Sequence, residues 1–176
     1  PENKRWNKAA LASLAYGYNI RLNILQLATF YNGIANKGKM VKPLFIEKIM
    51  KDGKISYEAE PQVMVNKLAS TEALNLMVSM LTKAVEKGTA KSIYTPNIKL
   101  AGKTGTARFE YWKKNEPAKY QSSFAGFFPA DNPKYTCIVV INRPNTSKGY
   151  YGATVAAPAF KEIAGKVFLK TPLNVE

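Results

Sequence analysis

Three strand-like segments in the second half of the chain constrain the fold more than any other feature. They are 98–109 (IKLAGKTGTARF), 122–129 (SSFAGFFP) and 134–141 (KYTCIVVI). The tripeptide Asp131-Asn132-Pro133 favours a turn between the last two strands. The stretch TCIVVI is apolar on both faces, which is typical of a central strand that helices cover. The three segments therefore predict a sheet enclosed by helices.

Three helical patterns accompany these strands, because apolar residues recur every three or four positions in each. The first helix covers 20–36 and ends near Gly38, and the second starts after Ser70 and ends near Gly88. The third covers about 153–169, with Pro158 tolerable in its first turn. The predicted buried faces are Ile20, Ile24, Leu27, Tyr31 and Ile34; Ala73, Met77, Met80, Leu81 and Ala84, with both methionines as core filler; and Ala156, Phe160, Ile163, Ala164 and Val167.

A hairpin separates the first two helices. Residues 39–56 read as two short strands around Asp52-Gly53, a dipeptide that favours tight hairpin turns. Residues 58–67 show no period and are expected to form a connection. The order helix, hairpin, helix, three strands, helix predicts an α+β fold, with helices packed on an antiparallel sheet. A chain of 176 residues is long enough to form one domain with its own core.

The composition removes several kinds of chemistry. The chain has no histidine, which excludes a Ser–His–Asp triad, a histidine base and a histidine-ligated zinc built from these residues. Cys137 is the single cysteine and is expected to be a small buried hydrophobe, because it cannot form an internal disulfide. We expect neither a metal ion nor a cofactor.

The net charge of +14 allows two interpretations. It favours anionic partners such as nucleic acid, acidic lipid or a carboxylate-rich polymer. The lysines are spread along the chain, however, and this favours a dispersed solvated surface as their explanation. Nucleic-acid-binding motifs are missing, so we expect no nucleic-acid partner. No apolar run reaches the length of a membrane span, and Pro1 stands where an initiator Met would, so targeting elements are expected upstream.

A charged residue lies inside the first strand, where Gly102 is followed by Lys103, Thr104, Gly105 and Thr106. Gly105 has no side chain and lets another element approach the backbone. Strand alternation would put Lys103 and Gly105 on one face, and both threonines on the other. A local twist or bulge would therefore be needed for Lys103 and both threonines to serve one site. An edge strand with solvated polar residues would explain the same pattern.

The surroundings of this lysine match a known pattern. The matching segments are 16–43 (YGYNIRLNILQLATFYNGIANKGKMVKP), 85–92 (VEKGTAKS), 122–141 (SSFAGFFPADNPKYTCIVVI) and 156–168 (AAPAFKEIAGKVF). Together with Lys-Thr-Gly, the third motif of serine penicillin-binding proteins and class A β-lactamases, they resemble the class B penicillin-binding proteins. The resemblance covers nearly the whole chain in order, and among class B proteins it is greatest to the septal, cell-division branch.

The resemblance implies a peptidoglycan D,D-transpeptidase with part of the penicillin-binding, serine β-lactamase-like fold. In that family a serine of Ser-x-x-Lys attacks the D-Ala–D-Ala carbonyl, and the acyl group then passes to an amine of a neighbouring stem peptide. The implied partners are peptidoglycan stem peptides, β-lactam antibiotics and, through the parent chain, membrane proteins of the division complex. The implied location is the periplasmic side of the cell envelope, in a parent protein anchored in the inner membrane.

The resemblance also implies roles for four residues. Lys103 would supply positive potential at the wall of the active site, and the hydroxyls of Thr104 and Thr106 would bind the donor's terminal carboxylate. The Thr106 backbone N–H would be one oxyanion donor, and such a donor lowers the barrier by on the order of 3 kcal/mol. Gly105 would leave room for the helix that carries the nucleophile.

The chain departs from the family pattern because it contains neither Ser-x-x-Lys nor Ser-x-Asn. In the family both motifs precede Lys-Thr-Gly. Residues 1–176 are therefore expected to be the C-terminal portion of a single, truncated transpeptidase domain, inactive alone, whose nucleophile and base lie before Pro1. A β-lactamase or β-lactam sensor of the same superfamily stays an alternative, as does a basic module that binds an anionic polymer.

Several other residues are weighed as parts of the site. Tyr111 and Trp112, in the loop 110–121, could line the cleft, contact a partner or lie in an ordinary exposed loop. Arg108 could aid carboxylate binding. The pair Tyr150-Tyr151 is expected to pack rather than to bind a ligand. Neither serine of the Ser122-Ser123 pair is nominated as a nucleophile, because no base lies nearby in the sequence.

Overall fold

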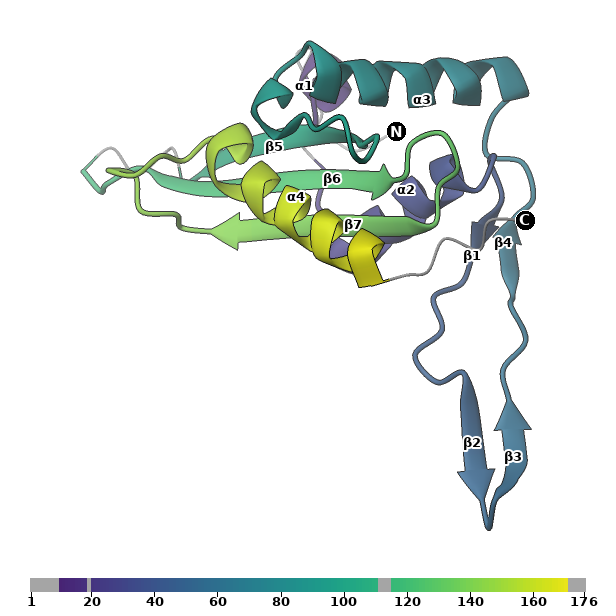
Figure 1. Cartoon of the computed structure of the whole chain (residues 1–176). Helices are drawn as coiled ribbons and strands as arrows, with labels where there is room; N and C mark the ends of the chain where they lie inside the picture. The colour runs from purple at the N-terminus through teal and green to yellow at the C-terminus, as the bar shows by residue number, and fades with distance from the viewer. Residues whose placement is uncertain (1–9, 19, 111–114, 171–176) are drawn as a thin grey trace.

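The structure is a computed structural model that describes residues 10–18, 20–110 and 115–170 (Figure 1). Its elements form one three-stranded sheet, two small strand pairs and helices around them. The helices are α1 (Ala10–Ala15), α2 (Ile24–Ala35), α3 (Thr71–Glu86), the 3-10 turn η1 (Lys91–Ile93) and α4 (Gly152–Lys170). The strands are β1 (Met40–Val41), β2 (Lys48–Lys51), β3 (Lys54–Glu58), β4 (Val63–Val65), β5 (Ala101–Phe109), β6 (Lys119–Phe128) and β7 (Tyr135–Asn142).

The main sheet has the order β5-β6-β7 and both pairings are antiparallel. Helix α4 covers one face of this sheet and α2 lies against the other, while α3 runs alongside β5 (Figure 1). The α+β prediction, with helices packed on an antiparallel sheet, is therefore confirmed. All three predicted strands exist, although the second begins at Lys119 inside the segment that was expected to be a loop.

The core has one layer on each face of β6. Towards α4, the rings of Phe124 and Phe128 pack against Phe160, with centroid distances of 4.6 and 5.7 Å. Towards α2 and α3, Phe127 packs against Ile34 and Leu81. Because side chains alternate across a strand, β6 buries apolar groups on both faces and is the central strand of the described sheet.

The segment TCIVVI forms β7, and the prediction that it is a central strand is wrong for the described sheet. Helices α2 and α4 both contact β7, so the expected cover on its two faces is present. In the described residues, however, β7 lies at one edge of the sheet and its side chains are only half-buried. An apolar pattern on both faces indicates cover by helices, and it carries no information on how many strands lie beside it.

The predicted inward face of α3 is confirmed at Leu81 and wrong at both methionines. Met77 and Met80 are 41% and 57% exposed, so neither fills the core. The buried face lies about one position further round the helix and includes Leu74, Leu81 and Thr82. Thr82 can be buried because its hydroxyl donates a hydrogen bond to the Val78 carbonyl at 2.8 Å. A pattern read from apolar residues alone cannot include such a threonine.

Helix α2 begins at Ile24, four residues later than predicted. Asn23 and Gln26 form a capping box, in which the Gln26 N–H donates to the Asn23 side chain at 2.8 Å and the Asn23 N–H to the Gln26 side chain at 2.9 Å. Ile20 and Ile24 are consequently exposed, whereas Ile34 is buried as predicted. The predicted stop near Gly38, which has φ of +92°, is confirmed.

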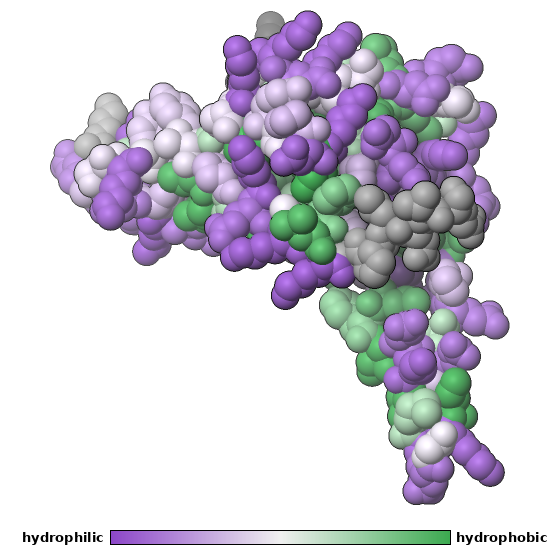
Figure 2. Space-filling view, in the orientation of Figure 1, coloured by the Kyte–Doolittle hydropathy of each residue, from purple (hydrophilic) through white to green (hydrophobic). Residues whose placement is uncertain are grey.

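Strands β2 and β3 form an arm that projects from the rest of the molecule (Figure 1). Asp52 and Gly53 connect them with φ values of +51° and +73°, as the predicted tight hairpin turn requires. Residues 58–67 are more than a connection, because β4 pairs with β1 there. Figure 2 shows apolar side chains on the surface of the arm. Among the described residues, no helix combines the length and apolar character that a bilayer crossing requires.

The start of α3 depends on Ser70, whose hydroxyl oxygen accepts a hydrogen bond from the Ala73 N–H at 3.2 Å. We expect the substitution Ser70→Ala to lower the free energy of unfolding by about 1 kcal/mol, because it leaves that N–H without its cap. Urea denaturation of the protein measures the change. A variant with wild-type stability would show that packing alone holds the helix start.

Candidate functional site

The Lys-Thr-Gly-Thr segment lies in β5, which is an edge strand of the described sheet. The pairing of β5 with β6 is continuous from Ala101 to Phe109, so β5 contains no bulge. Thr104 pairs with Phe124 and Thr106 with Ser122, so both threonine side chains lie on the face of the sheet that α4 covers. The Lys103 side chain leaves the strand on the other face. Alternate backbone N–H groups of such a strand point outward from the sheet, towards its open edge.

Lys103 reaches Thr104 around this edge although β5 has no bulge. Its ammonium Nζ donates to the Thr104 carbonyl oxygen at 3.1 Å and to the Thr104 Oγ1 at 3.3 Å. Among the described residues, no carboxylate lies within ion-pair distance of Lys103. The long lysine side chain thus brings a positive charge, which no described carboxylate pairs, to a hydroxyl on the opposite face of its own strand.

Thr106 is tied to the start of α4. Its Oγ1 accepts a hydrogen bond from the Gly152 N–H at 3.0 Å, across 46 residues of sequence. The hydroxyl keeps its own proton to donate, because a hydroxyl is one donor and also an acceptor. The N-terminal end of a helix carries partial positive charge, which favours an anion beside Thr106. Arg108 is exposed on the same face further along β5, and its role stays a prediction.

Thr89 is a neighbour of the motif to which the sequence reasoning gave no role. Its Oγ1 lies 3.1 Å from the Oγ1 of Thr104. Thr89 belongs to the segment VEKGTAKS, which follows from the end of α3 into η1. That segment is part of the family resemblance, and this was the sequence signal that could have pointed to a role for Thr89.

The start of α4 lies directly against the backbone of β5 at Gly105, and the role expected of Gly105 itself stays a prediction. A Cβ atom on Gly152 would lie 2.5 Å from the Gly105 carbonyl oxygen and 2.4 Å from the Ser123 carbonyl oxygen. A Cβ atom on Gly105 itself would lie 2.5 Å from the Ser123 hydroxyl. The absence of a side chain on Gly152 therefore allows α4 to begin directly on the motif strand, whereas the space left by Gly105 is on the opposite face.

A group of aromatic rings lies beyond the motif. The Tyr120 and Tyr150 rings stack at 4.1 Å, and Tyr151 lies 4.4 Å from Tyr150. The Tyr150 hydroxyl donates to the Tyr151 hydroxyl at 3.1 Å, and this hydrogen bond raises the pKa of Tyr150 to about 12. Ser122 is fully buried, and its hydroxyl donates to the Tyr150 carbonyl. The tyrosine pair thus packs as predicted, and Ser122 holds the segment that leads to α4.

The loop between β5 and β6 is described only in part. Tyr111 and Trp112, two candidates from the sequence, lie outside the described residues. At the end of the loop, the Lys119 ammonium donates to the carboxylates of Glu110 and Glu116, the latter at 2.8 Å. These hydrogen bonds, that to Glu110 first, raise the pKa of Lys119.

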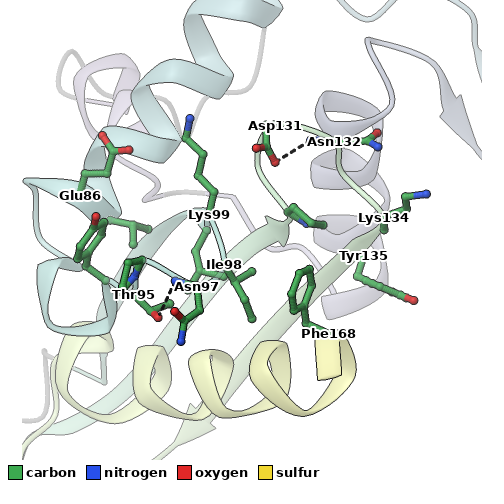
Figure 3. A pocket seen from close by; sticks show the side chains of 15 residues that line it. Glu86, Thr95, Asn97, Ile98, Lys99, Asp131, Asn132, Lys134, Tyr135 and Phe168 are labelled. Carbon is green, nitrogen blue, oxygen red and sulfur yellow. Dashed lines mark hydrogen bonds between the residues drawn. The ribbon is translucent and has the colours of Figure 1, made fainter. Parts of the chain in front are cut away.

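A cavity of about 710 Å³ lies before the start of β5 and contains none of the motif residues (Figure 3). Its floor is apolar, with Val85, Ile98 and Leu100, and charged side chains such as Lys99 and Lys134 stand at its rim. The cavity lacks the hydroxyl pair and the open strand edge. The candidate site is therefore the β5 edge at Lys103 and not this cavity.

Comparison with known proteins gives matches over nearly the whole chain. The family model of the penicillin-binding protein transpeptidase domain matches residues 1–165. The probable peptidoglycan D,D-transpeptidase PenA of Neisseria gonorrhoeae is 35% identical over 92% of this chain and 26% of its own length. The peptidoglycan D,D-transpeptidase FtsI of Escherichia coli K12 is 32% identical over 100% of this chain and 28% of its own length. The chain thus spans about a quarter of these curated relatives.

Solved structures show the same likeness. The apo transpeptidase domain of penicillin-binding protein 3 from Burkholderia pseudomallei matches with a TM-score of 0.76 and 27% identity, over 98% of this chain and 50% of that one. Penicillin-binding protein 3 from Mycobacterium tuberculosis, in complex with ampicillin, matches with a TM-score of 0.78 and 29% identity, over 94% and 38%. The family predicted from the sequence is confirmed. This chain belongs to the penicillin-binding protein transpeptidase family.

Proposed function

We propose that the protein containing this chain is a serine-type peptidoglycan D,D-transpeptidase that cross-links stem peptides during cell division and is a target of β-lactams. The observation that carries the proposal is the group of cationic and hydroxyl side chains on the open edge of β5. Lys103, Thr104 and Thr106 offer donors to an anion, and the described residues provide no carboxylate that neutralises the lysine. The names of relatives such as FtsI support the same activity.

In this proposal the donor peptide enters with its terminal carboxylate against the two threonine hydroxyls. Charge-assisted hydrogen bonds of this kind are about twice as strong as neutral ones, and the Lys103 ammonium adds attraction. The Thr106 backbone N–H then stabilises the negative charge that develops on the carbonyl oxygen during attack. A serine attacks the D-Ala–D-Ala carbonyl, an ester forms and the terminal D-Ala leaves with the proton. An amine of a second stem peptide then attacks the ester and releases the serine.

We further propose that residues 1–176 are the C-terminal portion of one transpeptidase domain, with the serine and its base in the residues before Pro1. Two observations support this. The chain corresponds to only half of the Burkholderia transpeptidase domain. In the described sheet, β7 has apolar residues but no strand on its outer side. Exposed apolar residues near the N-terminus also suit cover by another part of the domain; they are Leu11, Tyr16, Ile20, Leu22 and Ile24.

The proposed location is the cell envelope, with this domain on the extracytoplasmic, periplasmic side and a membrane anchor in the upstream part. The relatives named FtsI and penicillin-binding protein 3 support an envelope protein. Contact with other division proteins would then be made through the parent chain.

The purified chain 1–176 is expected to remain unlabelled by a fluorescent penicillin, because the nucleophile and base are absent from its sequence. The parent protein is expected to form a stable covalent adduct at a serine upstream of this chain. Gel fluorescence and mass spectrometry of the adduct measure both results. Labelling of the isolated chain would show that the nucleophile lies within residues 1–176, and this would overturn its proposed place before Pro1. Fast release of hydrolysed penicillin by the parent would favour a β-lactamase.

A further inference from the structure

The hydroxyl of Thr89 lies 3.1 Å from that of Thr104 and has no part in the proposed chemistry. We propose that Thr89 is a positioning residue, which orients the Thr104 hydroxyl so that its proton points at the bound carboxylate. This inference rests on the proposed function, because it needs an anion at β5. It assigns a task to the Gly-Thr-Ala segment, 88–90, which lies outside the motif strand.

The backbone around Thr89 is fixed, although its side chain is exposed. The Gly88 N–H donates to the Lys83 carbonyl at 3.0 Å, and the Ala90 N–H to the Ala84 carbonyl at 3.0 Å. Ala90 is fully buried, and a Cβ atom on Gly88 would lie 2.8 Å from the Ala84 Cα. The end of α3 thus holds both neighbours of Thr89, and this brings its hydroxyl to a defined place beside β5.

The hydrogen bonds at the Thr104 hydroxyl define what Thr89 can do. A threonine hydroxyl has one proton to donate and two lone pairs to accept with. The Thr104 oxygen accepts from the Lys103 ammonium at 3.3 Å and lies 3.1 Å from the Thr89 oxygen. When Thr89 donates to Thr104, both lone pairs of Thr104 are occupied. The Thr104 proton is then directed away from both donors and is available to a carboxylate, which can only accept.

Thr106 is held in an equivalent way, since the Gly152 N–H donates to its oxygen at 3.0 Å. Each anion-binding hydroxyl therefore accepts a hydrogen bond from a donor on a neighbouring segment, Thr106 from the start of α4 and Thr104 from Thr89. The side chain of Thr89 would act only through Thr104, and it would influence only ligands that carry the carboxylate.

The test compares acylation of the parent protein by benzylpenicillin and by its methyl ester, which lacks the anion. Thr89→Val keeps the shape of the side chain and removes the hydroxyl. We expect this variant to react about tenfold more slowly with the acid, because the lost hydrogen bond supports the binding of a charged carboxylate. Its rate with the ester should be unchanged. Thr89→Ser keeps the hydroxyl and is expected to restore the preference for the acid.

The ester rate also reports on folding, because a misfolded variant would lose both reactions together. Equal losses for acid and ester, or an unchanged preference in Thr89→Val, would overturn the positioning role. A wild-type protein that reacts equally with acid and ester would overturn it as well. Failure of the proposed function itself would be recognised separately, since the wild-type parent would then form no adduct with either compound.

Discussion

Lys103→Ala in the parent protein is expected to slow acylation by benzylpenicillin about a hundredfold or more, the loss typical of removing a preorganised charge or donor at a reacting centre. The ammonium contacts Thr104 at 3.1 and 3.3 Å, and the described residues hold no carboxylate in ion-pair contact with it. Its removal takes away the positive potential and one of the bonds that orient the Thr104 hydroxyl. Stopped-flow measurement of the second-order acylation rate gives the size of the effect.

Lys99→Ala is the matched control for this prediction. Lys99 is also exposed and lies four residues earlier, at the rim of the cavity shown in Figure 3. Its loss changes the net charge by the same amount but leaves the β5 edge intact. We expect a nearly unchanged rate for Lys99→Ala. Similar losses in both variants would mean that the general positive charge of the chain, rather than the ammonium at the motif, accelerates the reaction.

The second large effect is expected for Gly152→Ala. The added Cβ would lie 2.5 Å from the Gly105 carbonyl oxygen and 2.4 Å from that of Ser123, and both are backbone atoms that cannot rotate away. The start of α4 must then move off the sheet, which would lower the free energy of unfolding by about 1–3 kcal/mol. The same movement breaks the bond from the Gly152 N–H to Thr106, so acylation should slow as well. Urea denaturation and acylation kinetics of the parent measure the two effects.

Gly165→Ala provides the control within the same helix. A Cβ at Gly165 would meet no atom within 4 Å, so this substitution should leave packing intact and stabilise the helix by about 0.5–1 kcal/mol. If Gly152→Ala also left the free energy of unfolding unchanged or raised it, as expected for Gly165→Ala, the close contact of α4 with Gly105 would be contradicted.

Much of the fold followed from local patterns. The three strands, the hairpin at Asp52-Gly53 and the end of α2 at Gly38 were predicted because alternation, turn residues and positive φ act over a few neighbouring residues. The face of α3 was predicted only in part, because Thr82 is buried through a hydrogen bond that an apolar pattern cannot register. The order of β6 and β7 in the sheet depends on pairing, which the side-chain pattern of one strand does not contain.

The candidate site was predicted in its residues but not in its geometry. Strand alternation indicated that a twist or bulge would be needed to bring Lys103 to both threonines, whereas the long lysine side chain reaches Thr104 around the open edge of a regular strand. Thr89 and Gly152 were missed because they reach the motif through contacts made only in the folded chain. No local rule relates a residue at the end of α3, or the first residue of α4, to the hydroxyls of β5.

A crystal structure of the parent protein acylated by a penicillin would show where the anion of the drug binds. We expect its carboxylate to lie about 3 Å from the hydroxyls of both Thr104 and Thr106, beside the Lys103 ammonium. A carboxylate bound elsewhere, for example between Lys99 and Lys134, with the β5 edge vacant, would contradict this expectation.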